Sequence, residues 1–239
     1  MIALLKHIAL VLQSILLPPF CTSCGALGSY LCKRCKDTIN PSSRQVCCYC
    51  LRPAYAGITH HRCRRRRGLD GAYHSFLYDG VVRKVVFKTK YGLRHQLLTD
   101  FLNEFQEAIV AGFTLLLANK EPILIPVPLH MSKVRKRGFN QAEILARWLA
   151  KETGLPVQKS VMRIRNTSPQ SSLISRKDRR RNIIGAFRYV SKERPIDTTA
   201  IIVDDIWTSG STAKEMCRLL KRVGFKTVYL FTLAGPYGH

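Results

Sequence analysis

Residues 200–212, AIIVDDIWTSGST, constrain the fold of this 239-residue chain more than any other segment. The apolar run at 201–203 is β-branched, which is typical of a parallel strand covered on both faces. Asp204 and Asp205 follow directly, at the carboxyl end of the strand, where open α/β sheets bind their ligands. Because carboxylates accept hydrogen bonds from sugar hydroxyls, the segment predicts a sheet with a sugar-binding edge.

The residues after this strand form a small loop rich in hydroxyl groups: Thr208, Ser209, Gly210, Ser211 and Thr212. A helical pattern over 213–220 follows, and the backbone N–H groups at the start of a helix favour a phosphate group. Neither GxGxxG nor the GK[ST] loop of nucleotide triphosphatases stands at this position. The pattern therefore indicates a sugar phosphate rather than either of these two nucleotide classes.

This segment resembles the signature of the type I phosphoribosyltransferases. Two further stretches, PVPLHMSKVRKRGFNQAEILARWLA at 126–150 and RNTSPQSSLISRKDRRRNIIGAF at 165–187, are similar to the ComF family, and the likeness covers nearly the whole chain. The resemblance implies a zinc-binding module like a double zinc ribbon, followed by a phosphoribosyltransferase-like doubly wound parallel sheet. It also implies binding of 5-phosphoribosyl 1-pyrophosphate (PRPP) with magnesium, and some members of the family serve DNA uptake in natural transformation.

The same resemblance assigns expected roles. Residues 208–212 would hold the 5-phosphate, while Asp204 and Asp205 would take the ribose hydroxyls and serve as the candidate catalytic residues. Magnesium would bridge the pyrophosphate and the ribose hydroxyls. The pyrophosphate would lie between the loop at 129–138 and a mobile basic hood at 166–182, and the cations expected to hold it are Arg135, Arg137, Arg176, Arg180 and Arg181.

The acceptor of a phosphoribosyl transfer is not identified by the sequence. Purine-salvage relatives carry an acidic residue at the position of Thr208, which disfavours hypoxanthine and guanine here. The absence of an amidotransferase triad and of an N-terminal catalytic cysteine excludes the glutamine-dependent step of purine synthesis. Trp207 is expected to pack beneath the loop, with a position beside the acceptor pocket as the alternative. Whether the protein is an active phosphoribosyltransferase stays open.

Charge predicts a polyanionic partner. The chain carries 39 Lys and Arg against 15 Asp and Glu, for a net charge of +24, which is more than one pyrophosphate-bearing ligand requires. The excess gathers at 62–67, 133–137 and 176–181. Charge without identified stacking residues favours sequence-tolerant contact with a nucleic-acid backbone, and single-stranded DNA fits that description. A basic surface that serves only closure and solubility is the alternative.

Seven of the nine cysteines and one histidine form pairs with zinc-ligand spacing: Cys21 and Cys24, Cys32 and Cys35, Cys47 and Cys50, and His60 and Cys63. Eight ligands suffice for two structural, tetrahedral zinc sites. The expected sites take the first four and the last four ligands, while a cross-braced pairing and a role for Cys48 or His61 stay open. Disulfides are disfavoured because no cleavable signal peptide is recognised.

Three regions are expected. Residues 1–20 form an amphipathic helix, too short and too polar to span a membrane, residues 21–70 form the zinc module, and residues 71–239 form the phosphoribosyltransferase-like domain. Within that domain we expect a strand entering a helix over 76–87, helices over 97–109 and 141–151, the latter capped by Asn140, and strands at 123–127, 183–190, 201–203 and 227–233. The protein is expected in the cytoplasm, with at most a peripheral contact at the inner face of the membrane.

Three functions fit these observations. The first is a ComF-type protein that binds PRPP with magnesium and single-stranded DNA, in contact with other proteins of the competence machinery. The second is an active phosphoribosyltransferase with an unidentified acceptor. The third is a zinc-based protein-interaction adaptor with a vestigial pocket, against which the intact Asp204, Asp205 and Gly210 argue.

Overall fold

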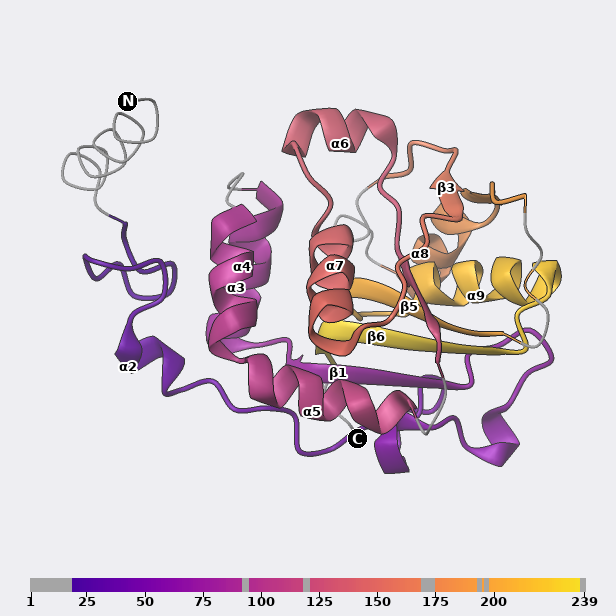
Figure 1. The fold of residues 1–239 in the computed structure, drawn as a ribbon, viewed down its shortest axis with the longest axis horizontal. Coiled ribbons are helices and arrows are strands. Elements are labelled where there is room, and N and C mark those ends of the chain that lie inside the picture. The colour runs from indigo at the N-terminus through magenta and orange to yellow at the C-terminus, as the bar shows by residue number, and fades with distance from the viewer. Residues whose placement is uncertain are drawn as a thin grey trace.

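A four-stranded parallel sheet forms the centre of the fold, in the order β1-β6-β5-β2 (Figure 1). The structure, a computed structural model, describes residues 19–91, 95–117, 121–168, 175–192, 195 and 198–236. The strands of this sheet are β1 (Gly71–Leu77), β2 (Ile123–Pro126), β5 (Thr199–Ile206) and β6 (Thr227–Gly235). The predicted α/β class with a parallel sheet is confirmed.

Strand β5 is covered on both faces, as its apolar run predicts. Ile201 and Val203 pack with residues of the helices on one face, and these helices are α3 (Gly80–Tyr91), α4 (His95–Glu104), α5 (Gln106–Leu117) and α7 (Gln141–Thr153). Ile202 packs on the other face against α9 (Ser211–Val223). Each of these three side chains is fully buried, which stabilises the fold by about 2 kcal/mol per residue.

Two boundaries differ from the sequence prediction. The first strand begins at Gly71 rather than Phe76, and the expected helix over 97–109 is two helices, α4 and α5, that meet at Phe105. The ring of Phe105 packs against Phe76 and Phe101, with ring centroids 5.4 and 4.8 Å away. The helix therefore breaks where an aromatic side chain enters the core, and periodicity alone does not reveal such a break.

A second, antiparallel sheet pairs β3 (Val161–Arg163) with β4 (Phe187–Tyr189). The predicted strand at 183–190 is correct only for its last part, because Ile183 ends helix α8 (Arg176–Ile183). This helix starts with a capping box, in which the Ser175 hydroxyl accepts a hydrogen bond from the Asp178 N–H at 3.0 Å. Serine followed three residues later by an acidic residue is a recognised signal for a helix start, which outweighs the short apolar stretch after it.

Helix α6 (Met131–Arg137) follows β2 and projects away from the sheet (Figure 1). None of its residues is buried, and it ends at Gly138 in the left-handed conformation. Helix α7 begins at the predicted cap: the Asn140 side chain accepts a hydrogen bond from the Ala142 N–H at 3.2 Å. The basic loop after β2 is thus a short exposed helix between two ordered elements.

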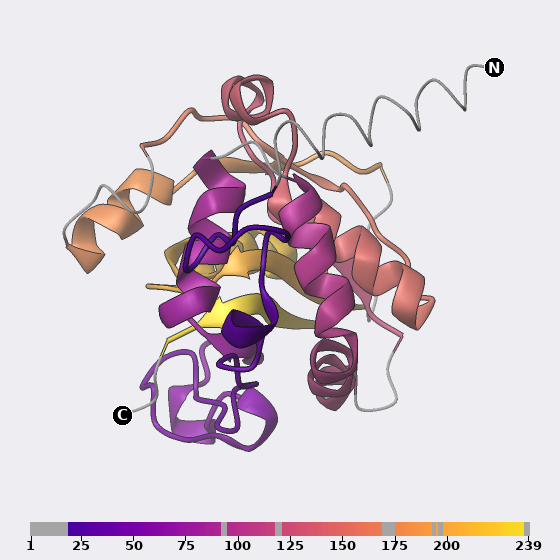
Figure 2. The same ribbon diagram turned by 90° about the vertical axis from the view of Figure 1, so that its left-hand side faces the viewer.

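The two cysteine-rich segments contact different parts of the domain (Figure 2). The first, which includes α2 (Lys33–Lys36), packs on α3 and α4, and Lys36 pairs with Glu104 at 2.5 Å. The second, which includes the 3-10 turns η1 (Tyr55–Gly57) and η2 (His61–Cys63), packs on β1 and α9. Gly57 has φ of 71°, and a Cβ there would lie 1.9 Å from the Ala72 carbonyl oxygen, so only glycine permits this close approach.

The division of the chain near residue 70 stays a prediction, since both cysteine-rich segments share hydrophobic clusters with the α/β domain. The amphipathic helix expected over residues 1–20 lies outside the described residues apart from its last two positions. Within the part of the chain that the structure describes, no helix has the length and apolarity needed to cross a membrane.

Candidate functional site

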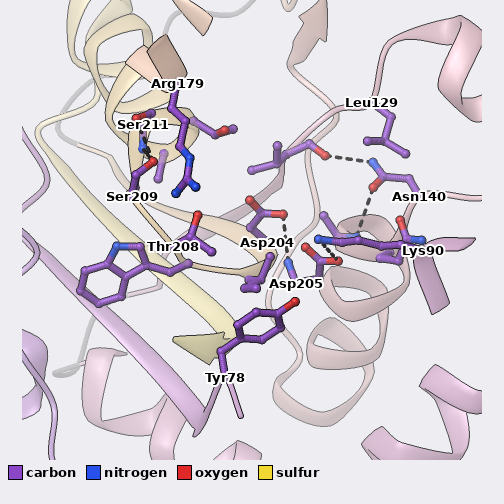
Figure 3. Close-up of a pocket in the computed structure, with 18 of the residues that line it drawn as sticks. Tyr78, Lys90, Leu129, Asn140, Arg179, Asp204, Asp205, Thr208, Ser209 and Ser211 are labelled. Atoms are coloured by element: carbon purple, nitrogen blue, oxygen red, sulfur yellow. Dashed lines mark hydrogen bonds and ion pairs between the residues drawn. The ribbon is translucent and has the colours of Figure 1, made fainter. Parts of the chain in front are cut away.

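A pocket of about 370 Å³ opens over the carboxyl end of β5, the edge that the sequence indicates (Figure 3). It brings together most of the predicted site residues: Asp204, Asp205, Thr208, Ser209, Gly210, Ser211, Thr212 and Arg137. These residues come from β5, the start of α9 and the exposed helix α6. Segments far apart in the sequence therefore meet around one cavity.

The two aspartates differ in their surroundings. Asp205 is buried, and its Oδ2 lies 3.0 Å from Nζ of Lys90, a residue of α3 (Figure 3). Asp204 accepts a hydrogen bond from the Asp205 N–H at 2.9 Å through its Oδ1. Burial alone would lower the pKa of Lys90, but the carboxylates of Asp205 and Asp204 raise it. Lys90 is therefore charged and balances one of the two carboxylates.

The second carboxylate remains only partly compensated. Burial, and then repulsion from Asp205, raises the pKa of Asp204 from 3.8 to about 7, although Lys90 opposes this shift. A carboxyl group whose pKa lies near neutral pH is typical of functional sites. The pair thus holds between one and two negative charges around neutral pH, and it favours a ligand that brings hydroxyl donors or positive charge.

The loop at 208–212 is built for an anion. Gly210 adopts the left-handed conformation with φ of 67° and caps α9 without a side-chain hydrogen bond. Ser209 and Ser211 join their hydroxyl oxygens at 2.9 Å (Figure 3). The Ser211 N–H points to the Ser209 hydroxyl oxygen at 3.4 Å. The first N–H groups of a helix have no intrahelical partner, which is the arrangement of phosphate-binding helix starts. Trp207 is buried, and its ring packs edge-on against His74, with centroids 5.8 Å apart.

A cluster of cations faces this loop across the pocket. Lys133 and Arg137 of α6 and Arg163 of β3 all line it. Burial, and then the charges of Arg163 and Arg137, lowers the pKa of Lys133 to about 8. Burial also lowers the pKa of Arg163, despite attraction to Asp204, and its Nε is buried without a hydrogen-bond partner in the structure. Cations that repel one another in a cavity mark a place for a polyanionic ligand.

The arginines predicted to bind pyrophosphate differ in whether they line the pocket. Arg135, Arg180 and Arg181 are exposed and lie outside the pocket lining, while the side chain of Arg176 lies outside what the structure describes. Arg179 of α8 lines the pocket instead and points toward it (Figure 3). Because α8 is helical, neighbouring arginines face different directions. The roles predicted for these residues toward pyrophosphate stay predictions.

Sequence reasoning did not single out Lys90 or Arg163, and it placed Lys133 and Arg179 only within the basic runs at 133–137 and 176–181. Lys90 lies in the last turn of a helix, where a cation is ordinary because it balances the helix dipole. Arg163 is at a buried position of a short strand, which is rare for arginine, and its guanidinium donates a hydrogen bond to the Thr167 hydroxyl and lies 5.6 Å from the Phe187 ring centroid. Its burial is visible only in the folded chain, so the sequence carried no signal for it.

The first four predicted zinc ligands, Cys21, Cys24, Cys32 and Cys35, form one cluster, with ligand atoms within 4.8 Å of one another. Burial alone would raise the pKa of Cys21, but backbone N–H groups, that of Cys32 foremost, lower it to about 6. The Cys32 N–H points to the Cys21 sulfur at 3.5 Å. Four thiols that converge in this way fit a tetrahedral structural zinc ion.

The second cluster joins Cys47, Cys50, His60 and Cys63, again within 4.8 Å. His60 turns Nδ1 to the Cys50 sulfur at 3.3 Å, and its Nε2 lies 3.0 Å from the Pro53 carbonyl oxygen. That carbonyl places the ring proton on Nε2 and leaves Nδ1 as a metal ligand. Three thiols and one oriented imidazole also fit zinc.

The clusters resolve the alternatives that the spacing left open. Each cluster uses two consecutive pairs, so the cross-braced pairing is not what the structure contains, and His61 belongs to neither cluster. The Cys48 sulfur lies 3.3 Å from the Thr59 hydroxyl oxygen instead. Burial, more than any other cause, raises the pKa of this thiol to about 11. Cys217 is buried, as expected of an ordinary core thiol.

Replacing Cys50 with Ser is expected to lower the zinc content from two ions per chain to one, because it removes a ligand from one of the two clusters. The matched control is Cys48→Ser, which is expected to keep both ions. Elemental analysis of protein purified with zinc measures the ratio. Equal zinc loss in both variants would contradict the ligand assignment.

Asp204 is expected to make stability depend on pH. Because its folded pKa lies above its unfolded value, its contribution is fully present below about pH 3.8 and is lost as pH rises through about 7. In urea titrations from pH 5 to 7, Asp204→Asn should remove this loss, which amounts to at most about 1.4 kcal/mol per pH unit. Asp100→Asn, at an exposed position, is the control, and identical pH profiles for the wild type and Asp204→Asn would refute the raised pKa.

Comparison with known proteins agrees with this geometry. Residues 118–237 match the Phosphoribosyl transferase domain family, which covers half of the chain. The chain is 37% identical to competence protein F of Haemophilus influenzae over 113 residues, or 46% of this chain and 49% of that protein. It is 36% identical to DNA utilization protein YhgH of Escherichia coli K12 over 115 residues, or 46% and 48% of the two chains.

A longer match covers most of the chain. The chain is 23% identical to competence protein ComFC of Bacillus subtilis over 212 residues, which is 85% of this chain and 83% of that protein. In its matches to competence protein F and YhgH, by contrast, the chain spans about half the length of these relatives. The chain therefore belongs to the phosphoribosyl transferase domain family and, together with these competence and DNA utilization proteins, to the ComF family.

Proposed function

We propose that this protein binds PRPP together with Mg²⁺ and handles single-stranded DNA in the cytoplasm during DNA uptake. One observation carries the proposal. A single pocket combines an anion-binding helix start, a carboxylate pair and a cation cluster, which are the three kinds of group that a phosphorylated sugar with a pyrophosphate requires. The names of the ComF relatives support the link to competence and DNA utilization.

The 5-phosphate would bind at residues 208–212, where the first turn of α9 offers N–H groups. The Ser209 and Ser211 hydroxyls, which are hydrogen-bonded to each other, would turn to donate to it. The ribose hydroxyls would donate to Asp204 and Asp205. Lys90 leaves lone pairs of both carboxylates facing the pocket, since it contacts only Asp205 Oδ2. The two carboxylates would thus accept hydrogen bonds from the ribose hydroxyls, while the loop at 208–212 would donate hydrogen bonds to the 5-phosphate.

The pyrophosphate would occupy the side of the pocket lined by Lys133, Arg137 and Arg163. Lys133 also donates to the Thr167 carbonyl oxygen at 2.7 Å, which ties α6 to the start of the hood segment. A bound pyrophosphate would relieve the repulsion that lowers the pKa of Lys133. These three cations would then stabilise the leaving group of a transfer reaction.

Magnesium fits the donor set of the pocket. Asp204 and Asp205 offer carboxylate oxygens, which are the ligands that Mg²⁺ prefers, and the pocket is open enough for a ligand that brings its own oxygens. When bound, the ion would neutralise charge between the pyrophosphate and the ribose. Its positive charge would also draw Asp204 toward the ionised form, because a nearby cation lowers the pKa of a carboxyl group.

The DNA would contact residues outside the pocket. Arg180 and Arg181 are exposed on α8, away from the cavity. At the mouth of the pocket, Phe87 is 54% exposed and lies on the same helix as the exposed Arg83. An exposed aromatic ring beside cations is a stacking surface for single-stranded nucleic acid. Arg180 and Arg181 would therefore contact the polymer outside the pocket, while Arg83 and Phe87 would contact it at the mouth of the pocket, which they line.

Transfer of the phosphoribosyl group to an acceptor is the second candidate. It is favoured by the aromatic wall that Tyr78 and Phe87 place beside the aspartates, with Tyr78 directed toward Asp205 (Figure 3). Aromatic side chains suit a planar acceptor. Release of pyrophosphate from Mg·PRPP in the presence of candidate acceptors distinguishes transfer from binding alone.

Replacing Arg137 with Ala is expected to weaken Mg·PRPP binding roughly 10- to 100-fold, because a charge-assisted contact to pyrophosphate is lost. Arg135→Ala is the matched control: this arginine lies two residues away on the same helix but outside the pocket. It should bind PRPP as the wild type does. Isothermal titration measures both affinities, and no PRPP binding by the wild-type protein would leave the adaptor function in front.

Replacing Arg180 and Arg181 together with Gln is expected to reduce the slope of log affinity for single-stranded DNA against log salt by about 1.4, or about 0.7 for each lost phosphate contact. PRPP affinity should stay unchanged. The control pair Arg147→Gln and Arg222→Gln removes the same charge from other exposed positions. If both pairs flatten the slope equally, the DNA does not bind at α8.

A further inference from the structure

We propose that the second cysteine cluster positions the phosphate-binding loop through Tyr49 and Lys214, so that PRPP affinity depends on this cluster and not on the first one. The proposal rests on the proposed function and extends it. It makes the segment around Cys47 and Cys50 part of the phosphate-binding apparatus rather than a separate structural module. Tyr49 and Lys214 are positioning residues, since neither lines the pocket.

Tyr49 stands between two ligands of the second cluster, Cys47 and Cys50. Its hydroxyl oxygen accepts a hydrogen bond from the Leu69 N–H at 2.9 Å, which holds the ring in one orientation. Two cations lie near the ring. The Arg65 guanidinium carbon is 4.7 Å from the ring centroid, and Lys214 Nζ is 5.1 Å from it. Both distances fall within the range of cation–π attraction.

Lys214 connects this ring to the loop. It belongs to the first turn of α9, and its Nζ lies 3.4 Å from the Ser209 carbonyl oxygen. Its Cε lies 3.5 Å from the place where a Cβ on Gly210 would be. The lysine therefore runs along the loop and brings a positive charge beside the phosphate-binding N–H groups. Tyr49 fixes where that charge stands.

The loop needs support of this kind. Gly210 caps α9 without a side-chain hydrogen bond, and the short contact between Ser209 and Ser211 lies within the loop itself. Glycine in the left-handed region has more conformational freedom than any other residue, so the loop loses more entropy when it is ordered. A contact from outside the loop reduces the freedom that a phosphate must otherwise remove on binding.

Among the described residues, the first cluster has no comparable link to the loop. Its hydrogen bonds to the helices join Lys84 Nζ to the Ser23 carbonyl oxygen at 2.9 Å and Lys36 to Glu104. Those partners belong to α3 and α4, on the other face of the sheet from α9. Both clusters offer zinc ligands, but in the part of the chain that the structure describes only the second contacts α9. A ligand substitution in the first cluster is therefore a control for the same substitution in the second.

Replacing Tyr49 with Leu tests the ring. We expect Mg·PRPP affinity to fall roughly three- to tenfold and amide exchange in residues 208–213, measured by mass spectrometry, to accelerate, with zinc content still at two ions. Tyr49→Phe keeps the ring and should keep both affinity and protection. Arg65→Ala removes the other cation near the ring, which has no hydrogen bond or ion pair with the described residues of the loop, and should leave the loop unchanged. If Tyr49→Leu behaves like Arg65→Ala, the proposal is wrong.

Lys214 provides a second, independent variant. Lys214→Met should accelerate exchange in the loop and weaken PRPP binding, while Lys214→Arg, which keeps a cation that can stack on Tyr49, should restore most of both. Cys50→Ser and Cys24→Ser compare the clusters: each is expected to lose one zinc ion, but only Cys50→Ser should loosen the loop. Equal loop exchange in these two cysteine variants would overturn the proposal.

Amide exchange and PRPP titration test the positioning role and the proposed function separately. If the wild type does not bind PRPP, the proposed function fails, yet the exchange data still decide whether the second cluster holds the loop. If the wild type binds PRPP and neither Tyr49→Leu nor Lys214→Met changes affinity or exchange, the proposed function stands and the positioning role is excluded.

Discussion

Two adjacent carboxylates at the end of β5 determine how the rest of the pocket is arranged. Charge at the edge of a buried sheet is costly unless opposite charge is close. Lys90 reaches Asp205 from α3, and the remaining negative charge is shared with Asp204, whose pKa rises. Around this pair stand the helix start of α9 and the cations of α6 and β3. The helix start contributes N–H groups and α6 and β3 contribute positive charge, so the pocket combines donors and cations with the carboxylate pair.

The fold follows from features that are local in the sequence. The run at 201–203 is buried on both faces as its β-branched residues indicate, and Asn140 caps α7 as its position suggests. The spacing of the cysteine pairs predicts the two ligand clusters, because ligands three residues apart converge on one ion. The loop at 208–212 leads into α9, as the order of strand, acids, glycine loop and helix predicts, and its binding of a phosphate stays a prediction.

The remaining site residues depend on contacts between distant segments. Lys90 precedes its partner Asp205 by more than a hundred residues, and Arg163 is placed by a small separate sheet. The hood was predicted as a run of arginines, but helix α8 determines which of them faces the pocket. The choice of Nδ1 in His60 likewise depends on the Pro53 carbonyl oxygen. Such choices are made by tertiary structure, and no local pattern carries them.

Helix α8 divides one residue type between two directions: Arg179 faces the pocket and its two successors face outward. Successive residues on a helix differ by about 100° in direction. The number of residues between the Ser175 cap and these arginines is therefore as important as their charge. A single insertion or deletion there would leave the composition almost unchanged but would change which arginines face the pocket. The number of residues between the cap and the arginines is therefore itself open to selection.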